Sequence, residues 1–503
     1  MSDRAIPRSY RTMQGFGVHT FRFVNATGES SFVKFHWNPV GGTQSLVWDE
    51  AVKISGADSD FHRRDLWEAI EAGAYPEWEL GVQIFTEEQA EAFTFDVLDA
   101  TKIVPEELVP VMPIGKMVLN RNPDNFFAET EQVAFCTAHV VPGVDFSNDP
   151  LLAGRIHSYV DTQISRLGGA NFHEIPINAP IAQVHNNQRD GMHRQALNRG
   201  RVSYEPNSLG GGCPFQAGAA GFVSVPEPME PSAHKVRGKP ERFADHYTQA
   251  TLFYNSQTKV EKTHIINAFK FELSRVQTPA IRERMISGLM NVDADMAQKV
   301  AEGLGIRTMP APMPKALKTT VKPEVVKSPT LSLFARPGDG GIRARRVAIL
   351  VADGVEGRGL KAIVERLTAA GAVPRFIGPQ LGSVKTTGGD AIEIDLPISA
   401  AASVLFDAIV LPDGNDAIDR LAGDGRAQEF LKDQYRHCKP ILVLGAASKL
   451  LTKVGIPQKL PSGQPDSGLV FGASKESQSA ATAFIAALAQ HRHFDRETDP
   501  PIV

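Results

Sequence analysis

The sequence predicts two unlike halves: an α+β half built on a partial antiparallel sheet, then an α/β half built on a parallel sheet. Alternating apolar residues near the start of the chain indicate half-buried antiparallel strands. After residue 344, continuous apolar runs separated by helical patterns indicate buried parallel strands. A stretch rich in Pro, Lys and Thr, over 307–343, lies between the halves and is interpreted as a linker.

The composition excludes several classes of protein. The 503 residues are 42% hydrophobic and 22% charged, values typical of a soluble globular chain with a large core. A net charge of −4 creates no field that recruits nucleic acid or an anionic membrane. No apolar run is long enough to span a bilayer, and no signal peptide is visible. Three widely spaced cysteines, Cys136, Cys213 and Cys438, favour a cytoplasmic location.

The first part of the chain predicts about four strands. Residues 18–24 and 32–37 alternate with a period of two around a turn at 25–28, and further strand patterns occupy 78–85 and 115–120. A short helical pattern covers 61–72. Four strands are few for a closed barrel of about eight, so we expect a partial barrel.

A helix with an unusual polar face is predicted to begin after Asp149. Asp149 suits the N-cap, Pro150 suits the first turn, and Gly168 suits the end. Residues three, four and seven positions apart share one face of a helix. The resulting stripe centres on a tyrosine and contains Leu151, Arg155, Tyr159, Thr162, Gln163 and Arg166, with Ser158 at its edge.

The tyrosine on this stripe has two interpretations. Free tyrosine ionises near pH ~10, so a phenolate at neutral pH needs about 4 kcal/mol of stabilisation. A guanidinium at about 4 Å could supply that order of energy, and a ferric ion bound to the oxygen could supply more. Alternatively, Tyr159 is an exposed residue that stacks on its neighbouring arginines, and the helix taken alone favours this second interpretation.

The rest of the chain divides by pattern. Residues 200–245 contain Gly210–Gly212 and many prolines, and are expected to be irregular. Several helical patterns follow between 247 and 305. Buried strands are then predicted at 347–351, 408–411 and 441–444, with a helix at 360–370, which together indicate a doubly wound parallel sheet.

Four segments together resemble the haem catalases: residues 6–21 (IPRSYRTMQGFGVHTF), 118–127 (VLNRNPDNFF), 131–135 (EQVAF) and 141–145 (VPGVD). The similarity covers essentially the whole chain and is greatest to the large-subunit branch, which carries an extra C-terminal domain. The predicted helix resembles the proximal haem-ligand motif of that family, Arg-x-Phe-x-Tyr-x-Asp-Thr-Gln. The resemblance implies an α+β catalase core with a wrapping segment and a helical domain.

The resemblance also implies a cofactor, a substrate and roles for the stripe. Haem would be the cofactor, hydrogen peroxide the substrate, water and oxygen the products, and the assembly a homotetramer. Tyr159 would bind the iron as a phenolate, and Arg155 would hydrogen-bond to its oxygen. The positions that would pack around the proximal side of the haem and its propionates are Phe135, Leu151, Ser158, Thr162, Gln163 and Arg166.

Two residues depart from the family pattern near this helix. His157 stands where the motif has phenylalanine, and it is expected to point away from the tyrosine stripe. Cys136 stands where some large-subunit catalases have a histidine that becomes cross-linked to the ligand tyrosine. We therefore expect no cross-link, and we expect Cys136 to be a small buried residue.

The similarity begins inside the catalytic domain of the family, and the distal histidine and asparagine motifs find no match. No distal catalytic residue is therefore assigned, and the alternative function is a haem-binding but catalytically incomplete catalase fragment. The remaining histidines of the first half are interpreted as structural or surface residues; they are His19, His36, His62, His139, His173, His185 and His193.

The C-terminal half resembles the flavodoxin-like fold of the DJ-1/PfpI and class I amidotransferase group. Gly445 stands at the position of the nucleophilic cysteine, and Glu356 resembles the supporting acid. We therefore expect a non-catalytic domain, which disfavours a hydrolase or deglycase function. The expected divisions are a partial barrel over 1–150, the ligand helix and wrapping segment over 151–245, a helical domain over 246–306, the linker over 307–343 and the flavodoxin-like domain over 344–503.

Overall fold

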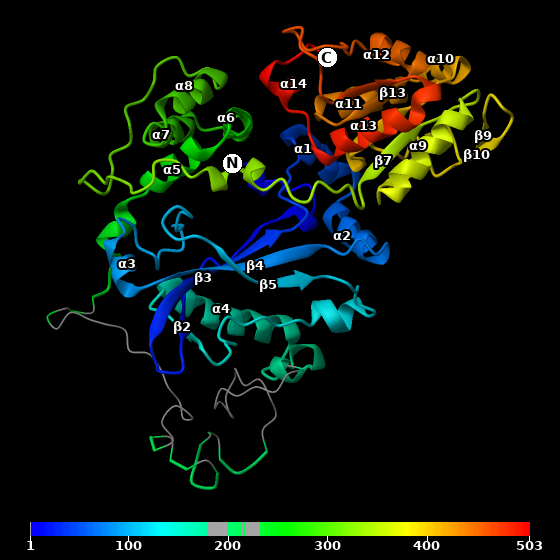
Figure 1. Ribbon diagram of the computed structural model, residues 1–503. Coiled ribbons are helices and arrows are strands. Elements are labelled where there is room, and N and C mark those ends of the chain that lie inside the picture. The colour runs from blue at the N-terminus through cyan, green and yellow to red at the C-terminus, as the bar shows by residue number, and fades with distance from the viewer. Residues whose placement is uncertain are drawn as a thin grey trace.

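A computed structural model describes residues 2–179 and 236–503, together with 181, 199–202, 204, 206–210, 212–213, 215–216, 232 and 234. Three structured parts follow one another: an antiparallel sheet with flanking helices, a group of four helices, and a parallel sheet covered by helices (Figure 1). His185, His193 and much of the segment expected to be irregular lie outside the described residues. Within the described residues, no helix is long and apolar enough to cross a membrane.

The antiparallel sheet has the strand order β5-β4-β3-β2-β6, and β1 pairs with β3. The strands expected from alternation are confirmed, although β5 begins at Met112 rather than at residue 115. Two additional strands, β1 and β6, are two and three residues long, which is too short for alternation to reveal. The strands are β1 (Gly15–Phe16), β2 (Phe21–Val24), β3 (Ser30–Pro39), β4 (Glu77–Phe85), β5 (Met112–Val118) and β6 (Val144–Phe146).

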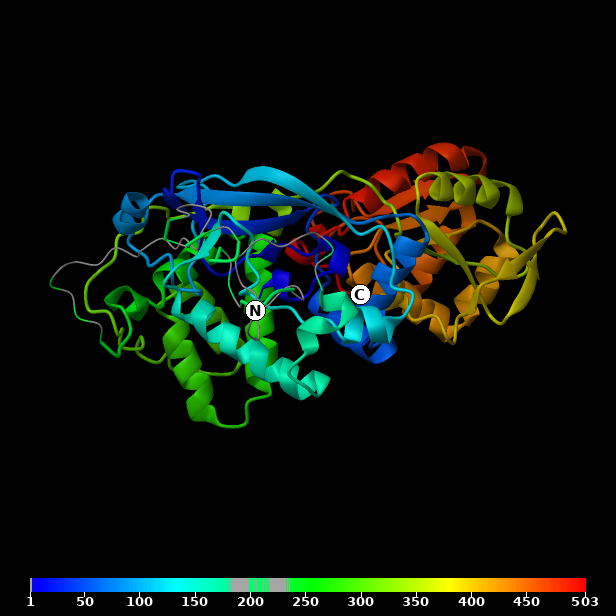
Figure 2. The ribbon, with the colours of Figure 1, turned by 90° about the horizontal axis from the view of Figure 1, so that it is seen from below.

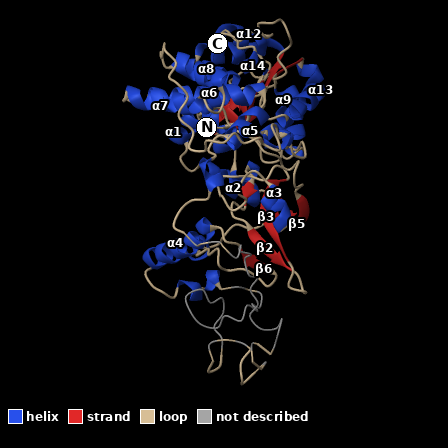
Figure 3. Cartoon of the chain, turned by 90° about the vertical axis from the view of Figure 1, so that its left-hand side faces the viewer, coloured by secondary structure: helices blue, strands red, loops and turns tan. Residues whose placement is uncertain are grey.

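One face of this sheet is covered by the segment that follows β4. Phe32 and Phe85 of the sheet pack against Phe95 and Val97 of that segment, which begins with the short helix α3 (Glu87–Ala92). Helix α4 (Pro150–Leu167) lies below the sheet in Figure 1, on the side away from the group of four helices, and Figure 3 shows the same separation. The expected tyrosine stripe is therefore carried on the side of the sheet away from the group of four helices.

The helical patterns expected between 247 and 305 are confirmed. Their buried side chains form one core that includes Ile265, Ile286, Met296 and Val300. The four helices are α5 (Thr248–Ser256), α6 (Lys259–Ser274), α7 (Pro279–Leu289) and α8 (Ala294–Gly303).

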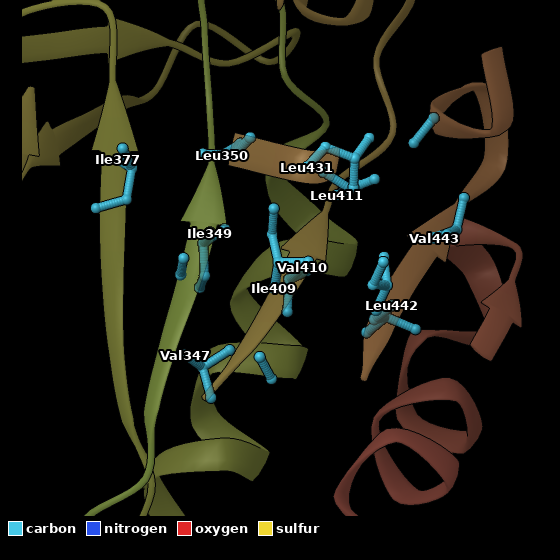
Figure 4. Packing of buried hydrophobic residues seen from close by; sticks show 14 of the residues in the cluster. Val347, Ile349, Leu350, Ile377, Ile409, Val410, Leu411, Leu431, Leu442 and Val443 are labelled. Atoms are coloured by element: carbon cyan, nitrogen blue, oxygen red, sulfur yellow. The ribbon is translucent and has the colours of Figure 1, made fainter. Parts of the chain in front are cut away.

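The C-terminal part is a parallel sheet in the order β11-β8-β7-β12-β13-β14, as the apolar runs predict. Figures 1 and 2 show α9 and α13 on one face of the sheet and α10 and α11 on the other. Its core contains Val347, Ile349, Val410 and Leu442, all fully buried between the layers (Figure 4). The strands are β7 (Arg346–Leu350), β8 (Val373–Gly378), β11 (Leu396–Pro397), β12 (Ala408–Leu411), β13 (Ile441–Leu444) and β14 (Leu469–Gly472), and a hairpin of β9 (Gly382–Lys385) and β10 (Ala391–Ile394) accompanies them. The helices are α9 (Gly357–Ala369), α10 (Asn415–Gly423), α11 (Gly425–Arg436), α12 (Ser448–Val454), α13 (Ser477–Ala489) and α14 (Asp495–Thr498).

Two helices after β3 join the antiparallel part to the C-terminal part. They are α1 (Trp48–Ala57) and α2 (Phe61–Glu71), of which only α2 was expected from the sequence. Ile54 of α1 and Phe61 of α2 form an apolar cluster with Val404, which precedes β12. The stretch 307–343 contains only two short 3₁₀ helices, Pro329–Leu331 and Leu333–Ala335.

Candidate functional site

Helix α4 begins and ends at the residues that its sequence signals predict. The Asp149 carboxylate accepts hydrogen bonds from the backbone N–H groups of Leu151 at 2.9 Å and Leu152 at 3.0 Å. Pro150 occupies the first turn, where no backbone donor is needed. Gly168 follows the last turn with a φ of +78°, a conformation that a β-carbon disfavours. These local interactions fix the orientation of the side chains on the helix.

Arg155 and Tyr159 meet on this helix, as their spacing predicts. Nη2 of Arg155 donates a hydrogen bond to Oη of Tyr159 at 2.7 Å, and the guanidinium lies 5.2 Å from the centroid of the phenol ring. The phenol oxygen keeps a further lone pair for a second partner, so it can act as a ligand for a metal ion.

His19 and Asp149 extend this pair into a buried chain of hydrogen bonds. Nδ1 of His19 lies 2.7 Å from Oδ2 of Asp149, and Nε2 of His19 lies 2.9 Å from Nη1 of Arg155. Because a guanidinium can only donate, Nε2 accepts and Nδ1 carries the proton that Asp149 accepts. His19 is 3% exposed and Asp149 is 1% exposed. His19 and Asp149, which are both buried, therefore hold the Arg155 guanidinium against Tyr159.

His19 is buried and hydrogen-bonded, in agreement with the expectation that it is a structural residue. Its contact with Arg155, next to Tyr159, was not expected. Its partners Asp149 and Arg155 lie 130 and 136 positions away in the sequence. No local spacing could have linked them, since only the fold brings the residue before β2 to the beginning of α4.

Gln163 and Arg166 hold the segment before α4 against the helix. Arg166 donates hydrogen bonds to the backbone carbonyl oxygens of Glu131 and Val133 and to the Gln163 side chain. The Gln163 amide in turn donates to the carbonyl oxygen of Phe135 at 3.4 Å. These contacts fix the 131–135 segment, and the expected role of both residues at haem propionates stays a prediction.

Apolar side chains near the tyrosine stripe are uncovered. Phe135 is 77% exposed and Leu151 is 52% exposed, while Ser158 and Thr162 are also exposed on the helix. Large exposed apolar side chains close to a few fixed polar groups are typical of a ligand surface. The donor set fits a haem, because a phenol oxygen with a cationic partner suits ferric iron and the apolar side chains suit a flat macrocycle.

The two residues that depart from the family pattern differ in outcome. His157 is exposed on α4, in agreement with the expectation. Cys136 is half-buried rather than fully buried, so that expectation is wrong in degree. Burial raises the pKa of the Cys136 thiol, which keeps it in the less reactive protonated form at neutral pH.

Other histidines of the first half serve the fold. Nε2 of His36 lies 2.9 Å from Oε1 of Gln83, and Nε2 of His62 lies 2.9 Å from the carbonyl oxygen of Pro7. His173 is 9% exposed and follows α4. These placements agree with a structural interpretation.

The C-terminal part has a carboxylate where a nucleophile would lie. Gly445, directly after β13, has a φ of +49°, and a β-carbon there would lie 2.1 Å from Oδ2 of Asp413. Asp413 accepts hydrogen bonds from Ala446 N at 2.9 Å and from the Ser474 hydroxyl at 2.6 Å. Glu356 caps α9 by accepting hydrogen bonds from the N–H groups that begin the helix.

Within the described residues, one group of side chains has the spacing of a metal site: Asp49, Asp433 and His437. The Lys53 ammonium lies 3.1 Å from Asp49 and 2.8 Å from Asp433, and His437 bonds to Asp49 at 2.8 Å. The Lys53 ammonium therefore already pairs with both carboxylates, and the group joins α1 to α11.

Comparison with known families gives three matches along the chain. A model for the catalase domain matches residues 1–211, and a model described as catalase-related immune-responsive matches residues 240–304. A model for the C-terminal domain found in long catalases matches residues 343–498.

Similar proteins are known from several bacteria. Catalase HPII of Pseudomonas putida is 50% identical over 503 residues, which cover 99% of this chain and 68% of that protein. Catalase HPII of Mycobacterium avium is 48% identical over 99% of this chain and 70% of its own length. Catalase-2 of Bacillus subtilis is 47% identical with the same coverage. The chain therefore belongs to the catalase family, and its C-terminal part matches the domain of the long catalases.

Proposed function

We propose that this protein is a haem catalase that converts hydrogen peroxide to water and oxygen, with Tyr159 as the proximal ligand of the haem iron. The observation that carries the proposal is the 2.7 Å hydrogen bond from Arg155 to the phenol oxygen of Tyr159. Relatives matched over 99% of the chain are named catalases, which favours catalase activity over the incomplete-fragment alternative.

Each residue of the site has a defined task under this proposal. Arg155 donates a hydrogen bond to the Tyr159 oxygen, and His19 with Asp149 fixes the guanidinium in place. Haem, when bound, supplies the redox chemistry by which one peroxide is reduced and another is oxidised. The uncovered side chains of Phe135 and Leu151 would pack on the macrocycle, and Ser158, Thr162, Gln163 and Arg166 would lie near its edge and propionates.

Reconstitution of the full chain with hemin tests this function. We expect a ferric tyrosinate charge-transfer absorption in the parent chain and none in Tyr159→Phe, which removes the oxygen and keeps the ring. Oxygen evolution from hydrogen peroxide is measured on both loaded proteins. A parent chain that takes up hemin with the same spectrum as Tyr159→Phe would contradict the assignment of Tyr159.

The C-terminal part, 344–503, we assign to a non-catalytic flavodoxin-like domain. The run β8-β7-β12-β13-β14 in its parallel sheet supports this, because it matches the 2-1-3-4-5 order of that fold. Asp413 at Gly445 supports the lack of nucleophilic chemistry, so a hydrolase or deglycase function is not proposed. The divisions 1–150, 151–245, 246–306 and 307–343 describe the preceding parts.

Assembly and location complete the proposal. None of the three cysteines forms a disulfide, in line with a reducing cytoplasm. A homotetramer is the assembly that the family resemblance implies, and light scattering after size-exclusion chromatography measures the mass of the assembly.

A further inference from the structure

Lys34 is a buried lysine, and its place on a strand gives no reason by itself for a charged side chain there. It lies on β3 and is 5% exposed. A buried ammonium must find acceptors, since its transfer out of water is costly. Nζ of Lys34 donates to the carbonyl oxygen of Val18 at 3.2 Å, and Val18 directly precedes His19 in the chain. The lysine therefore contacts the segment that presents His19 to Arg155.

Three hydrogen bonds to other parts of the chain hold the segment that contains His19. The N–H of Gly17 donates to the carbonyl oxygen of Phe35 at 2.7 Å, and the hydroxyl of Thr20 donates to the carbonyl oxygen of Val97 at 2.6 Å. Lys34 supplies the third contact, between these two. It acts on the carbonyl group directly before His19, so its loss would loosen the peptide that orients the imidazole.

We propose that Lys34 is a positioning residue for the Tyr159 site, which holds the peptide before His19 so that His19 keeps Arg155 against Tyr159. The inference rests on the proposed function of Tyr159. It adds a residue from the sheet to a site whose other members come from α4 and from the segment before β2.

The test compares three variants of the full chain after reconstitution with hemin: Lys34→Met, Lys34→Arg and Lys102→Met. Lys102 is a matched control, because it is also buried at 9% exposure but pairs with Asp99 and has no contact with the His19 segment. We expect Lys34→Met to bind hemin about tenfold more weakly and to lose most of the tyrosinate absorption, the size expected for a residue that supports a metal ligand indirectly. Lys34→Arg should restore the spectrum, and Lys102→Met should leave it unchanged.

The outcomes separate this inference from the proposed function. A parent chain without the tyrosinate spectrum would overturn both. A parent chain with that spectrum, and a folded Lys34→Met that binds hemin within twofold of it with the same spectrum, would overturn only the role of Lys34. An equal loss in Lys102→Met would also overturn it, because the effect would then be general. If Lys34→Met does not fold, Lys34→Gln is measured in its place by the same criterion.

Discussion

Arg8 and Asp407 form a buried ion pair between residues 399 positions apart. Nη2 of Arg8 donates to Oδ2 of Asp407 at 2.7 Å, and Nη1 lies 3.3 Å from Asp65 of α2. Burial alone would raise the pKa of Asp407, but the charge of Arg8 holds that pKa well below its ordinary value. The C-terminal part is thus joined to the first residues of the chain by a buried ion pair.

Arg8→Met should lower the free energy of unfolding by about 3–5 kcal/mol, because it leaves the buried Asp407 carboxylate without its closest cation, whereas Asp65 keeps Arg11 at 2.8 Å. Urea denaturation followed by circular dichroism measures this change. Arg63→Met is the control, since Arg63 pairs with Asp60 on the surface and such pairs contribute about 1 kcal/mol or less. Equal losses in the two variants would contradict a special role for the buried pair.

Arg155→Lys should weaken the tyrosinate spectrum of the hemin-loaded chain although it keeps the positive charge. Arg155 uses one nitrogen for Tyr159 and another for His19, and a lysine ammonium lacks the planar geometry that reaches both. Absorption spectroscopy across a hemin titration measures the effect, for which we expect about a tenfold loss of affinity. An unchanged titration would show that charge alone suffices at this position.

Asp149 combines two tasks that substitutions can separate. Asp149→Asn keeps a good N-cap for α4 but weakens the acceptor for His19, whereas Asp149→Ala removes both. We expect only Asp149→Ala to lose about 1 kcal/mol from the cap, and both variants to lose the tyrosinate spectrum to a similar degree. Thermal unfolding of the chain without hemin measures the first effect, and hemin titration the second. A normal spectrum in Asp149→Asn would remove His19 from the site.

How much of this site could be predicted from the sequence depends on how far apart in the chain the interacting residues lie. The limits of α4 and the Arg155–Tyr159 contact depend on residues within one or two helical turns, so local patterns reveal them. His19 and Lys34 reach the site only because β2 and β3 pair and β6 leads into α4. Their partners lie far away in the sequence, and a single sequence holds no sign of such contacts. The short strands β1 and β6 escaped prediction for a related reason, since pairing with neighbours stabilises them rather than their own alternation.

Stability should fall at alkaline pH through His264. Burial alone would lower the pKa of His264, but hydrogen bonds to Asp3 and Glu497 outweigh it and raise that pKa to about 10. A group whose pKa is raised in the folded state stabilises the fold fully below its unfolded pKa of about 6.5, and this contribution is lost as pH rises to about 10.

The variant His264→Gln isolates this contribution. The free energy of unfolding of the parent chain minus that of His264→Gln should decrease between pH 6 and pH 9.5, by up to about 4 kcal/mol. Urea denaturation at both pH values measures the difference. His157→Gln, which alters an exposed histidine, should show no such change. A difference independent of pH would mean that His264 is not held protonated by the two carboxylates.

Gly445→Ala should destabilise the C-terminal part by more than its backbone conformation alone explains. A methyl group there would meet the Asp413 carboxylate, which is fixed by the N–H of Gly414 at 2.8 Å, the N–H of Ala446 and the Ser474 hydroxyl. Gly455→Ala is the matched control, because Gly455 has a φ of +78° with no atom within 4 Å of the added carbon.

We expect about 1–2 kcal/mol of destabilisation for Gly455→Ala, from the left-handed backbone alone, and at least about 1 kcal/mol more for Gly445→Ala. Thermal and urea unfolding give both values. In the double variant Gly445→Ala/Asp413→Ala the methyl group no longer meets a carboxylate, so part of the stability lost in Gly445→Ala should return. The recovery should be smaller than the cost of the collision, because removing the carboxylate also leaves two backbone N–H groups without their acceptor. Equal effects of the two single substitutions would mean that Asp413 moves aside freely. The space after β13 would then be open to a side chain, and Asp413 would no longer support the proposal that the C-terminal part is non-catalytic.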